Sequence, residues 1–150
     1  ALNVFLDACL NRDPKRANMS GALKTVSQWS LPVLSVLCYG LTLTAALGYP
    51  SRIEIVVPLL TGILLLVIGN YLPKTKQSYT MGIRLPWTLQ SEENWNRTHR
   101  LSGFLWVAAG AAFILLSLLR LWNIWLLGAL LLALIFVPIG YSYFLHKKGI

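Results

Sequence analysis

The chain has 150 residues and a formal net charge of +8; 56% of its residues are apolar and 12% are charged. Soluble domains of this size carry about 25% charged residues, so the composition excludes a disordered chain, a coiled coil and an ordinary water-soluble globular protein. We therefore expect an all-α integral membrane protein that forms a single domain over residues 1–150. The two cysteines, Cys9 and Cys38, are too few for a disulfide framework.

The chain opens with an apolar stretch, residues 1–10, that is too short to cross a bilayer, because a spanning helix needs about 20 residues. Asp7 lies within it, and a polar segment with four Lys and Arg follows at 11–27. We interpret residues 1–10 as a partial N-terminal helix, the end of an earlier span. The sequence is thus expected to lack an N-terminal portion of the protein.

Four long apolar stretches follow and predict a bundle of four transmembrane helices. Ser30 is expected to cap the first, with Pro32 in its first turn. Only residues 120–123 separate the last two stretches, which predicts an antiparallel hairpin. The expected spans are 29–48, 53–72, 100–119 and 122–145.

Small residues predict where these helices pack closely. Gly62 and Gly69 are seven residues apart and share one helix face, which a neighbouring helix can approach. In the third span we expect a second small face, formed by Gly103, Ala108, Ala111 and Ala112.

Residues 73–99 form the long polar connection between the second and third spans. Apolar and polar residues alternate over 78–85, which predicts an extended segment with one apolar face. Pro86 and Trp87 end it. A helix then restarts with Thr88 or Ser91 as its N-cap and continues without a breaker into the third span.

The distribution of Lys and Arg predicts the orientation. Eleven lie in the 11–27 segment, the 73–100 loop and the C-terminal segment, whereas only Arg52 and Arg120 lie on the opposite side. By the positive-inside rule, the N-terminal segment, the long loop and the C-terminus are expected to be cytoplasmic. Because the cations sort by membrane side and form no patch with stacking aromatics, we expect no direct nucleic-acid binding.

A stripe of residues on one helix face marks the entry to the third span. Trp95, His99, Ser102 and Trp106 are spaced by four, three and four residues,. The structural interpretation is an aromatic belt with a histidine satisfied by a neighbouring helix. The functional interpretation is a polar pocket formed by His99 with Asn70, Arg84 and Glu93, in which Arg84 meets an anion.

Other chemistries find little support. The sequence has no zinc-type ligand spacing and no nucleophile motif, so we expect no metal, cofactor or catalytic residue. The residues expected to bind a ligand or partner, or to form a latch, are Asn70, Lys74, Arg84, Thr88, Glu93, Trp95, Thr98 and His99.

Three blocks in this region carry a family resemblance: 70–74 (NYLPK), 82–89 (GIRLPWTL) and 95–103 (WNRTHRLSG). Together they resemble the signature of the SdpI family of bacterial membrane immunity proteins. The resemblance implies a multi-pass protein of the bacterial cytoplasmic membrane, with about six helices and further spans upstream. It also implies two partners besides the bilayer: a secreted antimicrobial peptide outside, and a small winged-helix repressor captured at the inner face.

The resemblance favours a non-enzymatic immunity and signalling protein. Two alternatives remain open. One is a membrane enzyme acting on a lipid or lipid-linked phosphate, with Arg84 holding phosphate and Glu93 and His99 as acid and base. The other is a structural or transport subunit, in which the loop tolerates substitution.

Overall fold

The computed structural model describes residues 8, 21–49, 53–79, 82–121 and 123–150. Within them the chain forms helices and no strand: α2 (Gly21–Ala46), α3 (Ile53–Tyr71), the 3-10 turn η2 (Leu72–Lys74), α4 (Pro86–Gln90), α5 (Glu92–Leu118) and α6 (Ile124–Lys147). The partial helix expected at 1–10 lies outside the described residues, apart from Ala8. In the described part, four helices are long and apolar enough to cross a membrane, as predicted.

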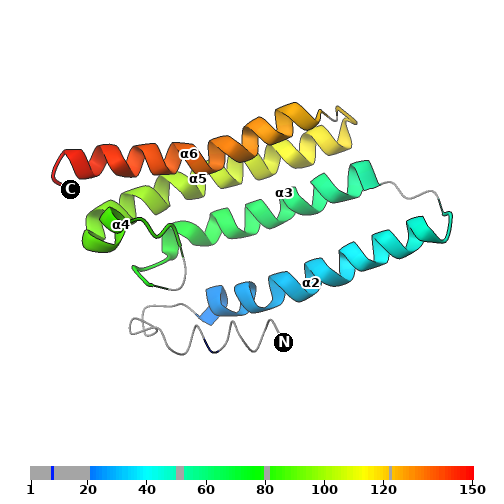
Figure 1. Cartoon of the computed structure of the whole chain (residues 1–150), viewed down its shortest axis with the longest axis horizontal. Coiled ribbons are helices and arrows are strands. Elements are labelled where there is room, and N and C mark those ends of the chain that lie inside the picture. The colour runs from blue at the N-terminus through cyan, green and yellow to red at the C-terminus, as the bar shows by residue number, and fades with distance from the viewer. Residues whose placement is uncertain (1–7, 9–20, 50–52, 80–81, 122) are drawn as a thin grey trace.

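The four long helices run side by side with alternating direction (Figure 1). The end of α2, the start of α3, the end of α5 and the start of α6 lie at one end, which we call the hairpin end (Figure 1). The start of α2, the segment between α3 and α5, and residues 147–150 lie together at the other end, which we call the connector end (Figure 1). The alternation therefore brings the start of α2, the basic segment between α3 and α5 and the basic C-terminal residues to one end of the bundle.

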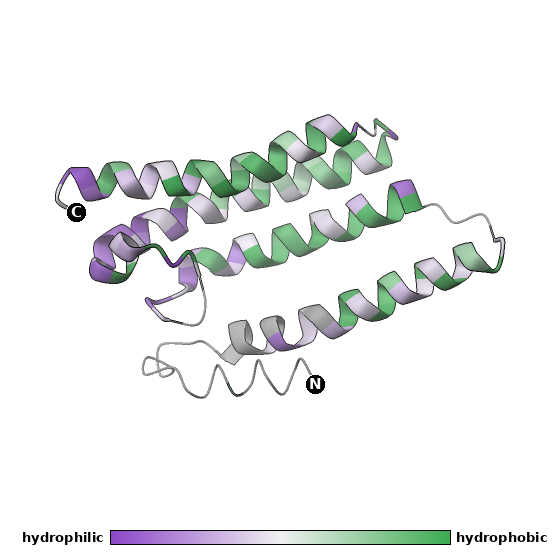
Figure 2. Ribbon diagram, viewed as in Figure 1, coloured by the Kyte–Doolittle hydropathy of each residue, from purple (hydrophilic) through white to green (hydrophobic). Residues whose placement is uncertain are grey.

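Hydropathy follows the same division. Apolar residues cover the length of the helices, and hydrophilic residues gather at the connector end (Figure 2). Large apolar side chains such as Phe104, Leu132 and Phe136 are exposed on the outer faces of α5 and α6. Exposed apolar surface of this extent suits a lipid environment, so the chain is a multi-pass membrane protein.

The helices end at features that are visible in the sequence. Gly48 has a φ of +79°, and Tyr49 N donates to Thr44 O over 3.1 Å, so α2 closes with a Schellman motif. At the hairpin between α5 and α6, Asn123 accepts hydrogen bonds from the amides of Trp125 and Leu126 and caps α6.

Of the expectations about helix starts, one needs correction and one is confirmed. Ser30 does not cap the first span, because α2 begins at Gly21 and Pro32 lies inside it; residues 21–28 hold no breaker, so the helix extends beyond the apolar stretch. Of the two caps proposed for α5, Ser91 is the one used, and its hydroxyl accepts from Asn94 N at 3.2 Å.

The close approach of α3 and α5 occurs through glycines, as expected for Gly62 and Gly69. A Cβ built on Gly62 would lie 2.8 Å from Gly110 O, and one on Gly69 would lie 2.8 Å from Val107 N. Gly69 also faces Gly103, whose own Cβ would lie 2.8 Å from Gly69 O. Two glycine pairs, each separated by seven residues, therefore meet across the antiparallel helices.

The expected small face of α5 was only partly right. Gly103 is buried, but Ala108 and Ala111 are exposed. The reason is helical geometry: at about 100° per residue, position 108 is turned roughly 140° from 103, whereas 110 returns to within about 20°. Gly103 and Gly110 are therefore the glycines of α5 that are turned to α3.

An apolar core closes the bundle between α3, α5 and α6. Its buried members are Leu65, Ala109, Phe113, Leu127 and Leu134. By contrast, α2 packs sparsely, mainly against α3, and none of its described side chains is fully buried. The rigid part of the molecule is therefore the three-helix unit that carries the long connection.

Candidate functional site

We call residues 75–91 the connector; it runs from η2 to α5 and contains α4. Its described residues 78–85 form neither helix nor strand. The expected alternation of faces holds over 82–85, where Ile83 and Leu85 are partly buried and Gly82 and Arg84 are exposed. It fails at the start of the segment, where Ser78 is buried and Tyr79 is exposed. Side-chain hydrogen bonds to the connector backbone, described below, determine its path, so the period-two pattern predicts which residues are covered over only part of the segment.

Two stacked rings on α5 form the centre of the site. Trp95 and His99 are fully buried (0% exposed), and their rings are 4.0 Å apart at an interplanar angle of 20°. One helical turn separates the two residues, which brings their side chains together on the same face. This confirms the spacing argument for the stripe at the start of the third span.

Each ring binds a different part of the connector backbone. Trp95 Nε1 donates to Thr75 O at 2.8 Å, and His99 Nε2 accepts from Ile83 N at 3.0 Å. Since a backbone amide can only donate, Nε2 carries no proton; Nδ1 carries it and donates to Trp95 O at 2.9 Å,. The neutral imidazole is therefore the form that holds the connector.

Gly82 lets the chain pass over these rings. Its φ is +109°, a region that side-chain-bearing residues rarely adopt. A Cβ there would lie 2.5 Å from His99 Nε2 and 2.7 Å from Trp95 Cη2. Both the backbone conformation and the available space require glycine next to the amide that His99 binds.

A second set of bonds holds the connector together internally. The Thr88 hydroxyl lies 2.9 Å from Ile83 O and from Leu85 O, and accepts from Leu85 N at 2.9 Å. Gln77 Nε2 donates to Thr88 O and Leu89 O at 2.9 and 2.8 Å. These bonds hold Gln77 and residues 83–89 together at the connector end of the bundle.

Asn94 joins α5 to α6 at the same end. Its Oδ1 accepts from Ser142 Oγ at 2.7 Å and from Thr98 Oγ1 at 3.1 Å, while Nδ2 donates to Ser142 O and Ile150 O at 3.1 Å. All four amide positions are used, and Asn94, Thr98 and Ser142 are fully buried. An apolar replacement would leave buried hydroxyls without their acceptor, at a cost of about 1–3 kcal/mol.

The comparisons with known proteins fall on this part of the chain. A sequence model of the SdpI/YfhL protein family matches residues 74–142. The similarity to this family therefore covers 69 of the 150 residues of the chain. A curated relative, Immunity protein SdpI of Bacillus subtilis (strain 168), is 34% identical over 76 residues. That alignment covers 51% of this chain but only 37% of the relative, and no solved structure matches.

The family region contains all the side chains whose hydrogen bonds are described above, although one of the acceptors of Asn94, Ile150 O, lies beyond it. Thr75, Gln77, Gly82, Thr88, Asn94, Trp95, His99 and Ser142 all lie between residues 74 and 142. The part of the chain that resembles the SdpI family is therefore also the part in which side chains hold the connector on the bundle.

The predicted site residues divide into two groups. Four of them are fully buried and make the hydrogen bonds described above: Thr88, Trp95, Thr98 and His99. Asn70, Lys74, Arg84 and Glu93 are exposed. A role for either group in binding a ligand or partner stays a prediction.

The charged members of the expected pocket have other partners. Arg84 Nη1 donates to Tyr79 O at 2.8 Å. Glu93 pairs with Arg97 at 2.6 Å on the outer face of α5. Six residues separate Glu93 from His99, which places them about 120° apart around the helix, so the acid–base pair of the enzymatic alternative is not formed in this arrangement.

Sequence reasoning gave no role to Gln77, Gly82, Asn94 or Ser142. One signal was available for Asn94: Asn94, Thr98 and Ser102 recur every four residues, a polar stripe in an otherwise apolar helix. No comparable signal marks Gln77 or Ser142, because their partners are backbone groups or residues far away in the sequence. Within the described residues, no cluster of His, Cys, Asp and Glu could hold a metal.

Proposed function

We propose that this chain acts as a membrane immunity protein of the SdpI type, protecting a bacterium against a secreted membrane-active peptide, and that the connector is its conformational switch. The observation that carries the proposal is the coincidence of the family region with the fastened connector. The name of the curated relative supports the immunity activity. The basic connector end supports a cytoplasmic location for the connector in the inner membrane.

The hydrogen bonds to the connector backbone suggest how a change in the membrane would reach the connector. Trp95 and His99 belong to α5. This helix packs along α3 through glycines at which there is no room for a Cβ atom. A shift of α5 against α3 would move both rings and so loosen the backbone groups at Thr75 and Ile83. The connector would then have two states, and a change in helix packing would decide whether its surface is covered or exposed.

His99 provides the direct test. In the His99→Phe variant, ring stacking is retained but the acceptor for the Ile83 amide is lost. We expect protection of sensitive cells against a secreted killing peptide to fall at least tenfold, at an unchanged membrane level of the protein. His99→Gln, whose side-chain oxygen can replace Nε2 as acceptor, should restore part of the protection. Wild-type protection by His99→Phe would rule out the switch.

We further propose that the exposed side of the connector, with Arg84 and Glu93, receives a cytosolic partner, the winged-helix repressor implied by the family resemblance. Arg84 is exposed and its backbone follows the amide that His99 binds, so release of the connector would reposition its guanidinium. The guanidinium suits bidentate recognition of a partner carboxylate.

For this docking role, we expect Arg84→Ala to reduce co-sedimentation of the purified repressor with membranes at least fivefold. Protection against the peptide should remain. Arg100→Ala removes an exposed guanidinium from α5 instead of the connector and serves as the matched control. This variant should bind the repressor normally. Equal capture by the Arg84→Ala and unmodified proteins would exclude Arg84 from the docking surface.

A further inference from the structure

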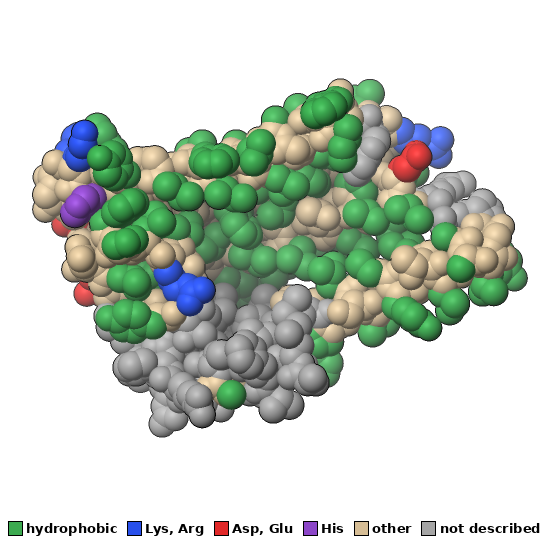
Figure 3. All heavy atoms as spheres, viewed as in Figure 1, with side chains coloured by type: hydrophobic (Ala, Val, Ile, Leu, Met, Phe, Trp, Pro, Cys, Tyr) green, Lys and Arg blue, Asp and Glu red, His purple; other side chains and the backbone are tan. Residues whose placement is uncertain are grey.

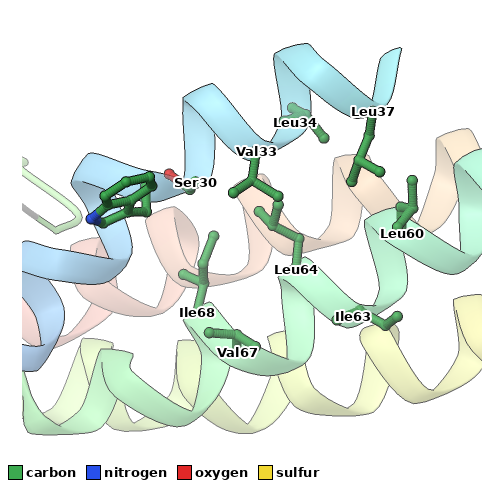
Figure 4. A pocket seen from close by; sticks show the side chains of 10 residues that line it. Ser30, Val33, Leu34, Leu37, Leu60, Ile63, Leu64, Val67 and Ile68 are labelled. Atoms are coloured by element: carbon green, nitrogen blue, oxygen red, sulfur yellow. The ribbon is translucent and has the colours of Figure 1, made fainter. Parts of the chain in front are cut away.

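An apolar groove runs between α2 and α3. It has a volume of about 240 Å³. Its lining consists of Trp29, Ser30, Val33, Leu34, Leu37, Leu60, Ile63, Leu64, Val67 and Ile68, and Figure 4 shows side chains of the two helices facing each other across it. Apolar cavities of about 150 Å³ stay dry and bind small hydrocarbons. A larger groove of the same chemistry is suited to a hydrocarbon chain.

The groove has one apolar and one cationic end. Leu60, Leu64 and Ile68 are spaced by four residues along α3, and Tyr71 follows three residues later on the same face,. Lys74 Nζ lies 5.5 Å from the centre of the Tyr71 ring. The ammonium is therefore held where the lining of the groove reaches the connector end, and basic side chains are visible at this end in Figure 3.

The charge at this end has no acidic counterpart nearby in the chain. Lys74 and Lys76 are both exposed, and no Asp or Glu occurs between Glu54 and Glu92. Glu54 lies at the opposite end of α3. Within the described residues the ion pair joins Arg97 and Glu93, and neither lysine takes part in one. Two such lysines beside an apolar groove match the two parts of an anionic phospholipid, its phosphate headgroup and its acyl chain.

We propose that the α2–α3 groove is a binding site for one anionic phospholipid, whose acyl chain lies along Leu60, Leu64 and Ile68 and whose phosphate is bound by Lys74. The site explains how α2 is held although it packs sparsely on α3. The lipid completes the contact between the two helices. Neither the immunity activity nor the connector switch is needed for this proposal.

Native mass spectrometry tests the site with defined lipids. The protein is purified in detergent with equal amounts of phosphatidylglycerol and phosphatidylcholine, and the retained lipid is measured. We expect one phosphatidylglycerol per chain, preferred about fivefold over phosphatidylcholine. Lys74→Gln should abolish this preference. Lys148→Gln, which changes the lysine that follows α6 and lies over Phe144, should keep it.

The groove itself is tested by filling it. Val33→Trp places an indole in the groove and should reduce retention of both lipids at least tenfold. Val36→Trp makes the same exchange one turn further along α2 at a side chain that is 72% exposed and does not line the groove, and should retain lipid normally. Circular dichroism verifies that both variants are folded.

Two results would overturn the proposal. One is equal lipid retention by the Val33→Trp and Val36→Trp proteins. The other is a lipid-free dimer that Val33→Trp alone dissociates, which would assign the groove to a second copy of the chain.

Discussion

Replacing Trp95 with alanine is expected to lower the free energy of unfolding by about 3–5 kcal/mol and to release the connector. Trp95 is fully buried, stacks on His99 and donates to the backbone at Thr75. The substitution therefore creates a cavity, removes the ring that supports His99 and leaves a carbonyl without its donor. No other single side chain in the described site combines these three roles.

Two measurements check this expectation. Detergent-solubilised protein is unfolded with sodium dodecyl sulfate to obtain the free energy, and trypsin cleavage after Arg84 reports on the connector. We expect cleavage to accelerate at least tenfold in Trp95→Ala. Trp125→Ala is the matched control, because Trp125 is 85% exposed at the hairpin end. Similar stability and cleavage rates in the two variants would contradict the role assigned to Trp95.

The second large effect is expected at the α3–α5 contact. Gly110→Ala should lower the free energy of unfolding by about 1–3 kcal/mol, although alanine favours a helix interior over glycine by about 1 kcal/mol. The added methyl group would lie 2.7 Å from Gly62 O and 2.8 Å from Leu66 N. Both are backbone atoms, so relief requires the helices to separate.

A glycine of α6 offers the comparison. No atom lies within 4 Å of a Cβ built on Gly128, so Gly128→Ala should leave stability unchanged or slightly raised. Titration with sodium dodecyl sulfate, followed by tryptophan fluorescence, measures both variants. If Gly110→Ala were as stable as Gly128→Ala, the close backbone contact between α3 and α5 would be wrong. Because the switch depends on this contact, Gly110→Ala is also expected to weaken protection.

The membrane helices could be predicted because hydrophobic length is a local property of the sequence. The spans expected at 53–72 and 122–145 correspond to α3 at Ile53–Tyr71 and α6 at Ile124–Lys147. Local chemistry also predicted the long α5, since no helix breaker separates Ser91 from the third span. At α2 the same reasoning placed the start too late, because hydropathy marks where a helix enters lipid and not where it begins.

The candidate site was predictable only where its parts share one helix. The spacing of Trp95 and His99 placed their rings together, and the structure shows them stacked. Gly82 stood in a recognised block, but its role emerges only from its φ of +109° and its contact with those rings. The pairing of Asn94 with Ser142 joins residues 48 positions apart, which no local pattern can reveal.

The sequence by itself determined that the chain carries four apolar stretches long enough to cross a membrane, that it resembles the SdpI family, and that aromatic and polar groups meet where the third span begins. Hydropathy, turn chemistry and helical spacing are properties of short stretches of the chain, so the sequence alone is enough to predict their consequences. Only the tertiary structure decided that His99 binds a backbone amide, that Glu93 faces away from it, and that the connector is fastened across the bundle. Those outcomes depend on which helices pack together and on how far each is shifted along its axis relative to its neighbour. Contacts between residues far apart in the sequence determine both.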